Sequence, residues 1–252
     1  VEAALQRRYV EQLIAAKYGW PCIQGLSGFT TNDFLSTAAG AGVRGVDGVG
    51  VWTDALLRPD AVPVGTQYVM SNFQFTGLKG YATLFGPSGE TAARNGAATA
   101  FSPSLAVAAD KVGKLSLHGM ASDASLVDYF VDGSRQGAGT ALAGYLKSDA
   151  GTFRCQAGGV QNGASGNSSP CTSFSIFGIA GGDAPQTAAN QAARAAAIKA
   201  AGAFVATGGV AATHAWSLID DRSSFSDLVG SDALTMTGTL TRAQIIVTSW
   251  PW

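Results

Sequence analysis

Charge is scarce in this chain, and its scarcity excludes several classes of protein. Only 13% of the 252 residues are charged, against about 25% in a typical soluble protein. The 16 basic and 17 acidic residues give a net charge of −1. No basic patch stands out, so nucleic acid is not expected as a partner. No apolar run approaches the length of about eighteen residues that a membrane-spanning helix needs.

Cysteine is also rare, and its three positions leave two interpretations open. Cys155 and Cys171 flank the Gly- and Ser-rich segment 158–170, where a disulfide would contribute about 3 kcal/mol. Three reduced, buried thiols are the alternative, because sequence alone does not fix the pairing. No Cys-x-x-Cys pair with a nearby His completes a zinc site. The chain starts at Val1 without Met or a signal sequence, which is typical of a processed chain or a fragment.

The clearest positive signal is the segment 115–133, which predicts two strands and their turns. Leu115 and Leu117 alternate with polar neighbours in the first strand. Residues 119–125 supply Ser, Asp and Gly for a turn. Asp132-Gly133 predicts a second tight turn at the end of the hairpin.

The second strand of this hairpin divides its side chains between two faces. One face, which we expect to point into the core, carries Val127, Tyr129 and Val131. The other face carries Leu126, Asp128, Phe130 and Asp132.

Further strands are predicted along most of the chain, at a spacing that suits a sandwich. Alternation or short apolar runs place them at residues 49–57, 66–75, 81–85, 97–108, 172–180, 214–221, 225–230, 234–240 and 244–248. The segments 25–48 and 90–96 are expected to be loops, because they are polar or rich in glycine.

Two helices are predicted beside the strands. The first spans residues 3–17, with apolar side chains four residues apart, within an N-terminal segment 1–20. The second spans 184–201, capped by Asp183 with Pro185 in its first turn. It is rich in Ala and poor in apolar bulk, so we expect it on the surface of a domain at 21–252.

The hairpin sequence Tyr-Phe-Val-Asp-Gly at 129–133 resembles the central hairpin of laminin-G-like domains, in the concanavalin A-like lectin and glucanase superfamily of bacterial or phage type. The segment 214–221, His-Ala-Trp-Ser-Leu-Ile-Asp-Asp, is similar to an opening strand of that family. The resemblance implies an all-β, two-sheet antiparallel jelly-roll sandwich with two accessory helices. The strand order looks rotated, which indicates a permuted domain or, as the alternative, a cut from a tandem array.

Enzymes of this kind need carboxylates that the chain does not place suitably. The family's β-glucanases use two Glu in a Glu-x-Asp-x-x-Glu strand, whereas the three glutamates here are Glu2, Glu11 and Glu90. Asp128 and Asp132 share a strand face, and we interpret them as solvated residues. His118 and His214 are not near a Gly-x-Ser-x-Gly elbow, so both are interpreted as structural or exposed. We therefore expect no enzyme.

Two kinds of binding site are candidates. The resemblance implies calcium at one rim, where the oxygen ligands would come from Asn32, Asp33, Asp123, Asp220 and Asp221. Turn formation is the alternative role of these residues. A glycan would contact aromatic and polar side chains, for which the candidates are Trp52, Tyr81, Asp128, Phe130, Tyr145 and Trp216. Core packing is the alternative role of the aromatic ones.

The sequence thus predicts a non-catalytic module that binds glycan or another cell-surface ligand. Its expected location is extracellular, on a cell surface or on a virion. The alternative is a structural subunit of a phage appendage, capsid decoration or extracellular fibre that assembles with copies of itself or with other structural subunits. Low charge and abundant small residues suit that alternative as well.

Overall fold

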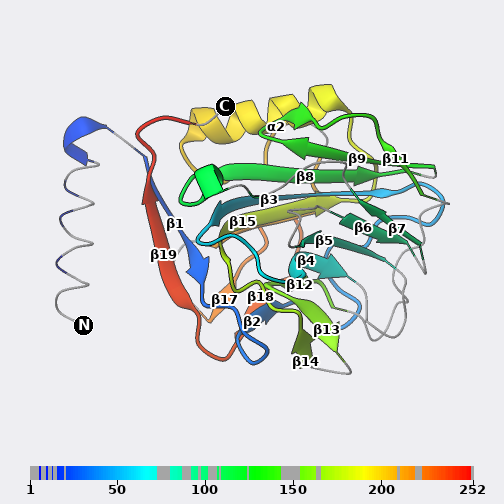
Figure 1. The fold of residues 1–252 in the computed structure, drawn as a ribbon, viewed down its shortest axis with the longest axis horizontal. Coiled ribbons are helices and arrows are strands. Elements are labelled where there is room, and N and C mark those ends of the chain that lie inside the picture. Colours follow the sequence, from blue (N-terminus) through cyan, green and yellow to red (C-terminus); the bar gives the residue numbers. More distant parts are fainter. Residues whose placement is uncertain are drawn as a thin grey trace.

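Two antiparallel sheets and one long helix make up the described part of the protein. The structure is a computed structural model, and it describes residues 6, 10, 13, 16–19, 21–72, 80–86, 92–95, 98–101, 107, 109–123, 125–142, 154–162, 166–208, 211–218 and 223–250. Figure 1 shows helix α2 (Ala188–Ala201) on one side of the larger sheet and the smaller sheet on the other. The predicted jelly-roll sandwich is confirmed.

The larger sheet, called the large sheet below, has nine strands. Its main path runs β10 (Ser134–Arg135), β9 (Leu126–Val131), β8 (Ser116–Ser122), β3 (Val51–Pro59), β15 (Phe174–Gly182), β1 (Cys22–Ser27) and β19 (Thr241–Ile246). Two short strands join this path at the side, β11 (Thr140–Ala141) on β9 and β16 (His214–Ser217) on β15.

The small sheet has six strands and closes the other side of the core. Its order is β17 (Ser224–Phe225), β18 (Leu234–Thr237), β2 (Phe34–Ser36), β12 (Gln156–Ala157), β4 (Gln67–Asn72) and β5 (Tyr81–Phe85). Two separate hairpins are β13 (Val160–Asn162) with β14 (Gly166–Ser168), and β6 (Ala92–Asn95) with β7 (Ala98–Phe101). A short 3-10 helix, η1 (Ala109–Lys111), precedes β8.

The large sheet is apolar on both faces because each face has a covering layer. Leu57, Met120 and Tyr129 face the small sheet in the main core. Trp52 and Phe130 face α2 in a second cluster. Alternation within one strand therefore does not separate buried from exposed side chains in this sheet.

The predicted hairpin is present, with a shorter turn than expected. In the pairing of β8 with β9, Met120 lies opposite Tyr129. The strand continues to Ser122, and Asp123 forms the turn by accepting hydrogen bonds at Oδ1 from Leu126 N (2.6 Å) and Ser125 N. The predicted turn at 119–125 is wrong over its first half, because β8 continues through these residues, with Gly119 and Ala121 facing α2 and Met120 facing the main core.

The expected assignment of faces on β9 is confirmed for its central residues. Val127 and Tyr129 lie in the main core, while Val131 is partly exposed. Asp132 and Gly133 have φ values of 53° and 80°, the left-handed pair that a tight hairpin turn requires. The second predicted turn is therefore confirmed.

Helix α2 begins later than predicted and, as expected, lies on the surface of the fold, where it packs against the large sheet through Gln191, Arg194, Ala195 and Ile198. Thr187 caps it by accepting a hydrogen bond from Asn190 N, and Gly202 ends it at φ +63°. Asp183 accepts a hydrogen bond from Gly45 N instead (2.9 Å). The predicted cap at Asp183 is therefore wrong. Small side chains let the helix approach the sheet closely, and a Cβ on Gly133 would lie 2.9 Å from Ala195.

Two strands lie in the segment 25–48 that was expected to be loop. The sequence pattern did not predict β1, because Gly25 interrupts its apolar residues. The strand needs glycine here, since a Cβ would lie 2.5 Å from the Ile176 carbonyl oxygen. Glycine therefore permits close strand packing at this position. Residues 92–95, expected to be a polar break, form β6. The predicted strand at 225–230 ends at Phe225.

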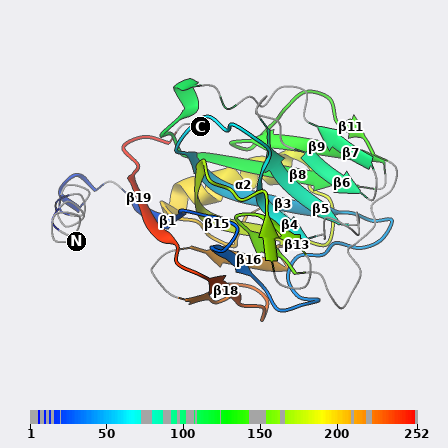
Figure 2. The same ribbon diagram turned by 60° about the horizontal axis from the view of Figure 1, so that its bottom comes forward.

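Both ends of the sandwich meet at one edge of the large sheet. β19 pairs with β1 over six residues, with Ile23 opposite Ile245 (Figure 2). The strand predicted at 244–248 is therefore present, although it runs from Thr241 to Ile246, and it pairs with a strand of the same chain. Trp250 packs against the cluster under α2.

Of the predicted helix 3–17, residues 6, 10, 13, 16 and 17 are helical and the others lie outside the described residues. No helix in the described ranges is long and apolar enough to cross a membrane.

His118 provides a test of this core. Its side chain is 8% exposed, its Nδ1 has no hydrogen-bond partner, and its ring meets Phe85 edge-on at 5.1 Å. Of the two interpretations from the sequence, structural or exposed, the structural one therefore holds for His118, although the residues that alternate with Leu115 and Leu117 were expected to form a polar face. Burial lowers the pKa of His118 from 6.5 to about 4.

We expect the protein to lose stability as the pH falls from about 6.5 to 4. In this window the unfolded chain binds a proton at His118 that the folded protein does not bind. At ~1.4 kcal/mol per pKa unit, the loss is about 3 kcal/mol. Urea unfolding at several pH values measures it. His118→Leu should flatten the curve in this window, and equal slopes for both proteins would contradict the assignment.

Candidate functional site

The aromatic residues expected to contact a ligand are mostly inside the protein. Four of them are no more than 1% exposed, namely Trp52, Tyr81, Phe130 and Trp216. A fully buried ring cannot stack on a sugar that arrives from solvent. Burial therefore removes these four as ligand contacts in this structure. Tyr145 lies outside the described residues. Asp128 is partly exposed and forms an ion pair with Arg135.

The carboxylates expected to hold calcium are used locally. Asp33 Oδ1 accepts a hydrogen bond from Thr239 N (2.7 Å), and its Oδ2 accepts one from Thr30 Oγ1 (2.5 Å). The Thr30 and Thr239 bonds hold the pKa of Asp33 below its ordinary value. Asp123 forms the β8–β9 turn, and Asn32 lies in the turn between β1 and β2. Asp220 and Asp221 lie outside the described residues.

No group of three potential metal-ligating His, Cys, Asp or Glu side chains occurs among the residues that the structure describes. The turn interpretation therefore accounts for Asp33 and Asp123. The calcium prediction for the full set stays untested.

Cys155 and Cys171 are buried and form no disulfide in the structure. The predicted disulfide between them is therefore not formed. The alternative of reduced, buried thiols fits these two cysteines, whereas Cys22 is half-buried. Burial raises the pKa of Cys155 to about 12 and also raises that of Cys171. Thiolate chemistry is accordingly unfavourable at both positions. Part of the intervening segment is ordered as the β13–β14 hairpin.

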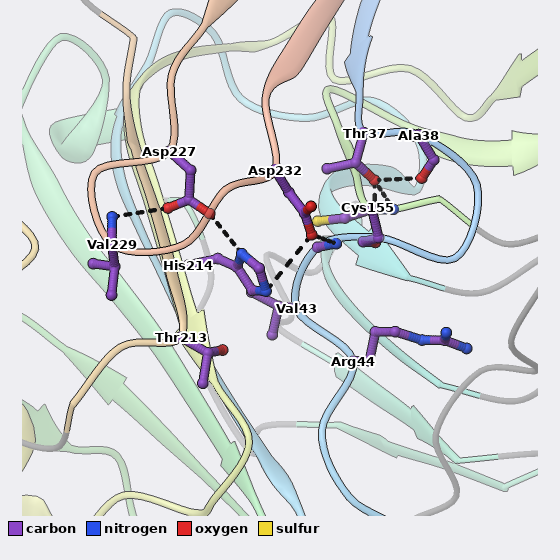
Figure 3. A network of polar contacts seen from close by, with 12 residues as sticks. Thr37, Ala38, Val43, Arg44, Cys155, Thr213, His214, Asp227, Val229 and Asp232 are labelled. Carbon is purple, nitrogen blue, oxygen red and sulfur yellow. Dashed lines mark hydrogen bonds and ion pairs between the residues drawn. The ribbon is translucent and has the colours of Figure 1, made fainter.

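His214 lies between Asp227 and Asp232 (Figure 3). Its Nδ1 is 2.6 Å from Asp227 Oδ2, and its Nε2 is 3.9 Å from Asp232 Oδ2. The ring stacks on Trp216 at 5.6 Å between centroids. β16 supplies His214 and Trp216, and the connections around β17 and β18 supply the two aspartates. The pair of His214 with Asp227 was not anticipated from the sequence.

Asp227 is held as an ionised carboxylate. Partial burial acts to raise its pKa, but hydrogen bonds from Ala215 N, His214 and Val229 N outweigh burial and leave the pKa lowered. An ionised Asp227 accepts a hydrogen bond from His214 Nδ1–H, so a neutral His214 ring has its lone pair on Nε2.

The position opposite Nε2 decides what this network can do. An acyl-transfer site places a Ser or Cys nucleophile there. Asp232 occupies it instead, and Asp232 Oδ2 accepts a hydrogen bond from Gly42 N (2.7 Å). Trp216 Nε1 donates to the Asp232 carbonyl oxygen (2.7 Å). The network therefore joins the segment before β18 to β16 and to the loop that contains Gly42, which is a structural role.

A groove lies between the turn that joins η1 to β8 and the C-terminal end of β19. Figure 1 shows the ribbon of these two segments at the same end of the large sheet. Its volume is about 470 Å³, and its lining residues are Lys111, Gly113, Lys114, Leu115, Ile245, Ile246, Val247, Thr248 and Ser249. One wall is thus the turn between η1 and β8, and the other is the end of β19. We call it the lysine groove.

The lysine groove combines the groups that sugar recognition uses. Lys111 and Lys114 are exposed cations, and Thr248 and Ser249 are exposed hydroxyls. Ile245 and Ile246 are half-buried and add apolar surface, while Leu115 and Val247 are buried. None of these residues was a candidate from the sequence. The sequence signal that could have indicated this groove is the pair Lys111 and Lys114, two cations close together in a chain with few charged residues.

The sequence matches no protein-family model and no curated protein. Solved structures share the fold. A candidate carbohydrate-binding protein from Bacteroides ovatus has a TM-score of 0.59 at 14% identity, over 91% of this chain and 61% of its own length. A heptameric SAP-like pentraxin from Limulus polyphemus has a TM-score of 0.53 at 12% identity, over 87% and 95%. The chain thus spans about three fifths of the Bacteroides protein. At these identities, the likeness establishes a shared jelly-roll sandwich.

Proposed function

We propose that this chain is a non-catalytic module that recognises glycans outside a cell or on its surface. The observation that carries the proposal is the lysine groove, where ammonium groups, hydroxyls and apolar side chains line one open site. Saccharides present hydroxyls together with apolar ring faces, and a mixed lining suits both. The shared fold with a candidate carbohydrate-binding protein supports the same class of ligand.

The polar network around His214, which lies apart from the lysine groove, supports recognition without catalysis. His214 Nε2 faces Asp232, whose carboxylate is already bound by Gly42 N. A glycosidase needs two carboxyl groups separated across a bound sugar. In this network Asp227 is engaged by Ala215 N and His214, so its oxygens are occupied by the protein itself.

A glycan array tests the proposal directly. We expect fluorescently labelled protein to bind a small set of oligosaccharides, and to leave the bound saccharides chemically unchanged after long incubation. Gly113→Trp, placed in the groove wall, should abolish the binding. Since Gly113 has φ +81°, circular dichroism must first show that this variant is folded.

Absence of binding to any saccharide would contradict the proposal, as would hydrolysis of the bound one. The assembly alternative has its own measurement, the mass in solution. A monomer fits the recognition module. A large regular assembly without glycan binding would favour the structural subunit.

A further inference from the structure

The two lysines of the groove differ in how far nearby carboxylates neutralise them. Lys111 Nζ lies 4.0 Å from Asp110, and both side chains are about two-thirds exposed. Burial raises the pKa of Asp132, and the positive charge of Lys111 acts to lower it. Asp132 Oδ1 also accepts hydrogen bonds from Leu117 N (2.8 Å) and Ser116 Oγ (3.1 Å). Within the described parts of the chain, no ion pair is found for the Lys114 ammonium. As far as the described residues show, Lys114 thus brings a positive charge to the groove that no carboxylate pairs with.

Backbone hydrogen bonds fix the wall that carries these lysines. Gly113 N donates to the Pro59 carbonyl oxygen at the end of β3 (2.7 Å), and Lys114 N donates to the Lys111 carbonyl oxygen (3.1 Å). The φ of +81° at Gly113 makes this turn accessible to glycine and strained for most other residues. The lysine Cα positions are thus held before any ligand arrives, which lowers the entropic cost of binding.

The facing wall is fixed as well and offers a different chemistry. Val247 N donates to the Pro21 carbonyl oxygen (2.9 Å), and β19 pairs with β1 up to Ile246. Thr248 and Ser249 follow as exposed hydroxyl residues. A ligand that spans the groove would meet cations on one side and neutral hydrogen-bonding groups on the other.

We propose that the lysine groove selects acidic saccharides, those that carry a carboxylate or a sulfate. The inference rests on the proposed glycan-binding function and names the class of glycan. Lys114, with help from Lys111, binds the acidic group, and the hydroxyls of Thr248 and Ser249 bind sugar hydroxyls. A long polyanion such as nucleic acid fits less well, because the net charge of the chain is −1.

The test uses an array of acidic oligosaccharides that carry uronate, sulfate or sialic acid. Each is paired with its neutral counterpart, which is carboxyl-reduced, desulfated or asialo. We expect binding to the acidic members and at least about tenfold weaker binding to their neutral counterparts. A charge-assisted hydrogen bond contributes enough for such a factor. Binding should weaken as salt is raised, because the lysines are exposed.

Substitutions assign the effect to the groove. Lys114→Gln should weaken binding of the best acidic oligosaccharide about tenfold, and Lys111→Gln should weaken it less. Arg135→Gln is the matched control, since it removes the same charge on β10, at the edge of the main strand path opposite β19. It should leave the affinity unchanged.

Each outcome separates the inference from the proposed function. Equal binding of acidic and neutral saccharides, or an unchanged affinity in Lys114→Gln, overturns the acidic selectivity while glycan binding stands. Binding of inorganic sulfate as tight as that of a sulfated oligosaccharide also overturns it, because the site would then be a simple anion site. Failure to bind saccharides of either class overturns both.

Discussion

Replacing Arg194 by Met should lower the free energy of unfolding by about 3–5 kcal/mol, the usual cost of leaving one member of a buried ion pair alone. Arg194 extends from α2 toward β3, where its Nε donates to Asp54 Oδ2 (2.7 Å), and both side chains are fully buried. Complete burial raises the pKa of Asp54, while the Arg194 guanidinium acts in the opposite direction. Without the guanidinium, the carboxyl group would remain in an apolar layer with no cation beside it.

Arg194 also holds the chain that follows α2. Its Nη1 donates to the carbonyl oxygens of Thr207 (2.9 Å) and Val205, and its guanidinium lies 4.8 Å from the Phe204 ring centroid. One side chain thus joins the helix, the large sheet and the segment 204–207. Its loss should affect all three, and not only the pair with Asp54.

Urea unfolding of the wild type and four variants, Arg194→Met, Asp54→Leu, their combination and Lys199→Met, measures this effect. Lys199→Met is the matched control, because it removes an exposed cation from the same helix and should cost well under 1 kcal/mol. The double variant Asp54→Leu with Arg194→Met should be more stable than the sum of the single losses predicts. If Arg194→Met costs no more than Lys199→Met, the pair does not hold the helix to the sheet.

Tyr129→Ala should also cost about 3–5 kcal/mol, because it empties a site in the centre of the main core. The side chain is 1% exposed and lies opposite Met120 on the neighbouring strand. The matched control is the adjacent residue, Asp128, whose ion pair with Arg135 is partly exposed. Asp128→Ala should cost less than about 1 kcal/mol.

The comparison also tests the assignment of strand faces. Both substitutions lie on β9, one residue apart, so they share the backbone environment and differ in the face they occupy. Thermal or urea unfolding of both variants should rank Tyr129→Ala as far more damaging. The reversed ranking would mean that β9 presents its other face to the small sheet.

Local pattern was sufficient to predict much of the β structure. The turn at Asp132-Gly133 was predictable because both residues tolerate positive φ. The strand at 81–85 was predicted with the bounds that the structure shows. In these segments the signal lies within a few consecutive residues, so sequence alone contains it.

The burial of Trp52 and Phe130 was not predictable in the same way. Both lie on the face of the large sheet that α2 covers, and α2 is separated from them in sequence by more than fifty residues. The Ala-rich helix gave no sign that it would cover a sheet. Its contact with the sheet depends on small residues, such as Ala195 against Gly133, and on a buried arginine. Arg194 alone, in a sequence, is indistinguishable from an exposed helical arginine.

The candidate site shows the same limit. The lysine groove forms where the turn at 111–115 meets the segment 245–249, two stretches that lie about half the chain apart. Sequence reasoning directed attention to aromatic residues, because sugars stack on exposed rings. Trp52, Tyr81, Phe130 and Trp216 belong to the core, and the open surface near β19 carries lysines and hydroxyls instead.

Titration of ¹⁵N-labelled protein with the best saccharide from the array tests the central claim most directly. Glycan recognition in the lysine groove predicts amide shift changes concentrated at 111–115 and 245–249, saturating with ligand and reduced in Lys114→Gln. Changes concentrated around His214 and Asp232, with 111–115 and 245–249 unaffected, would contradict it.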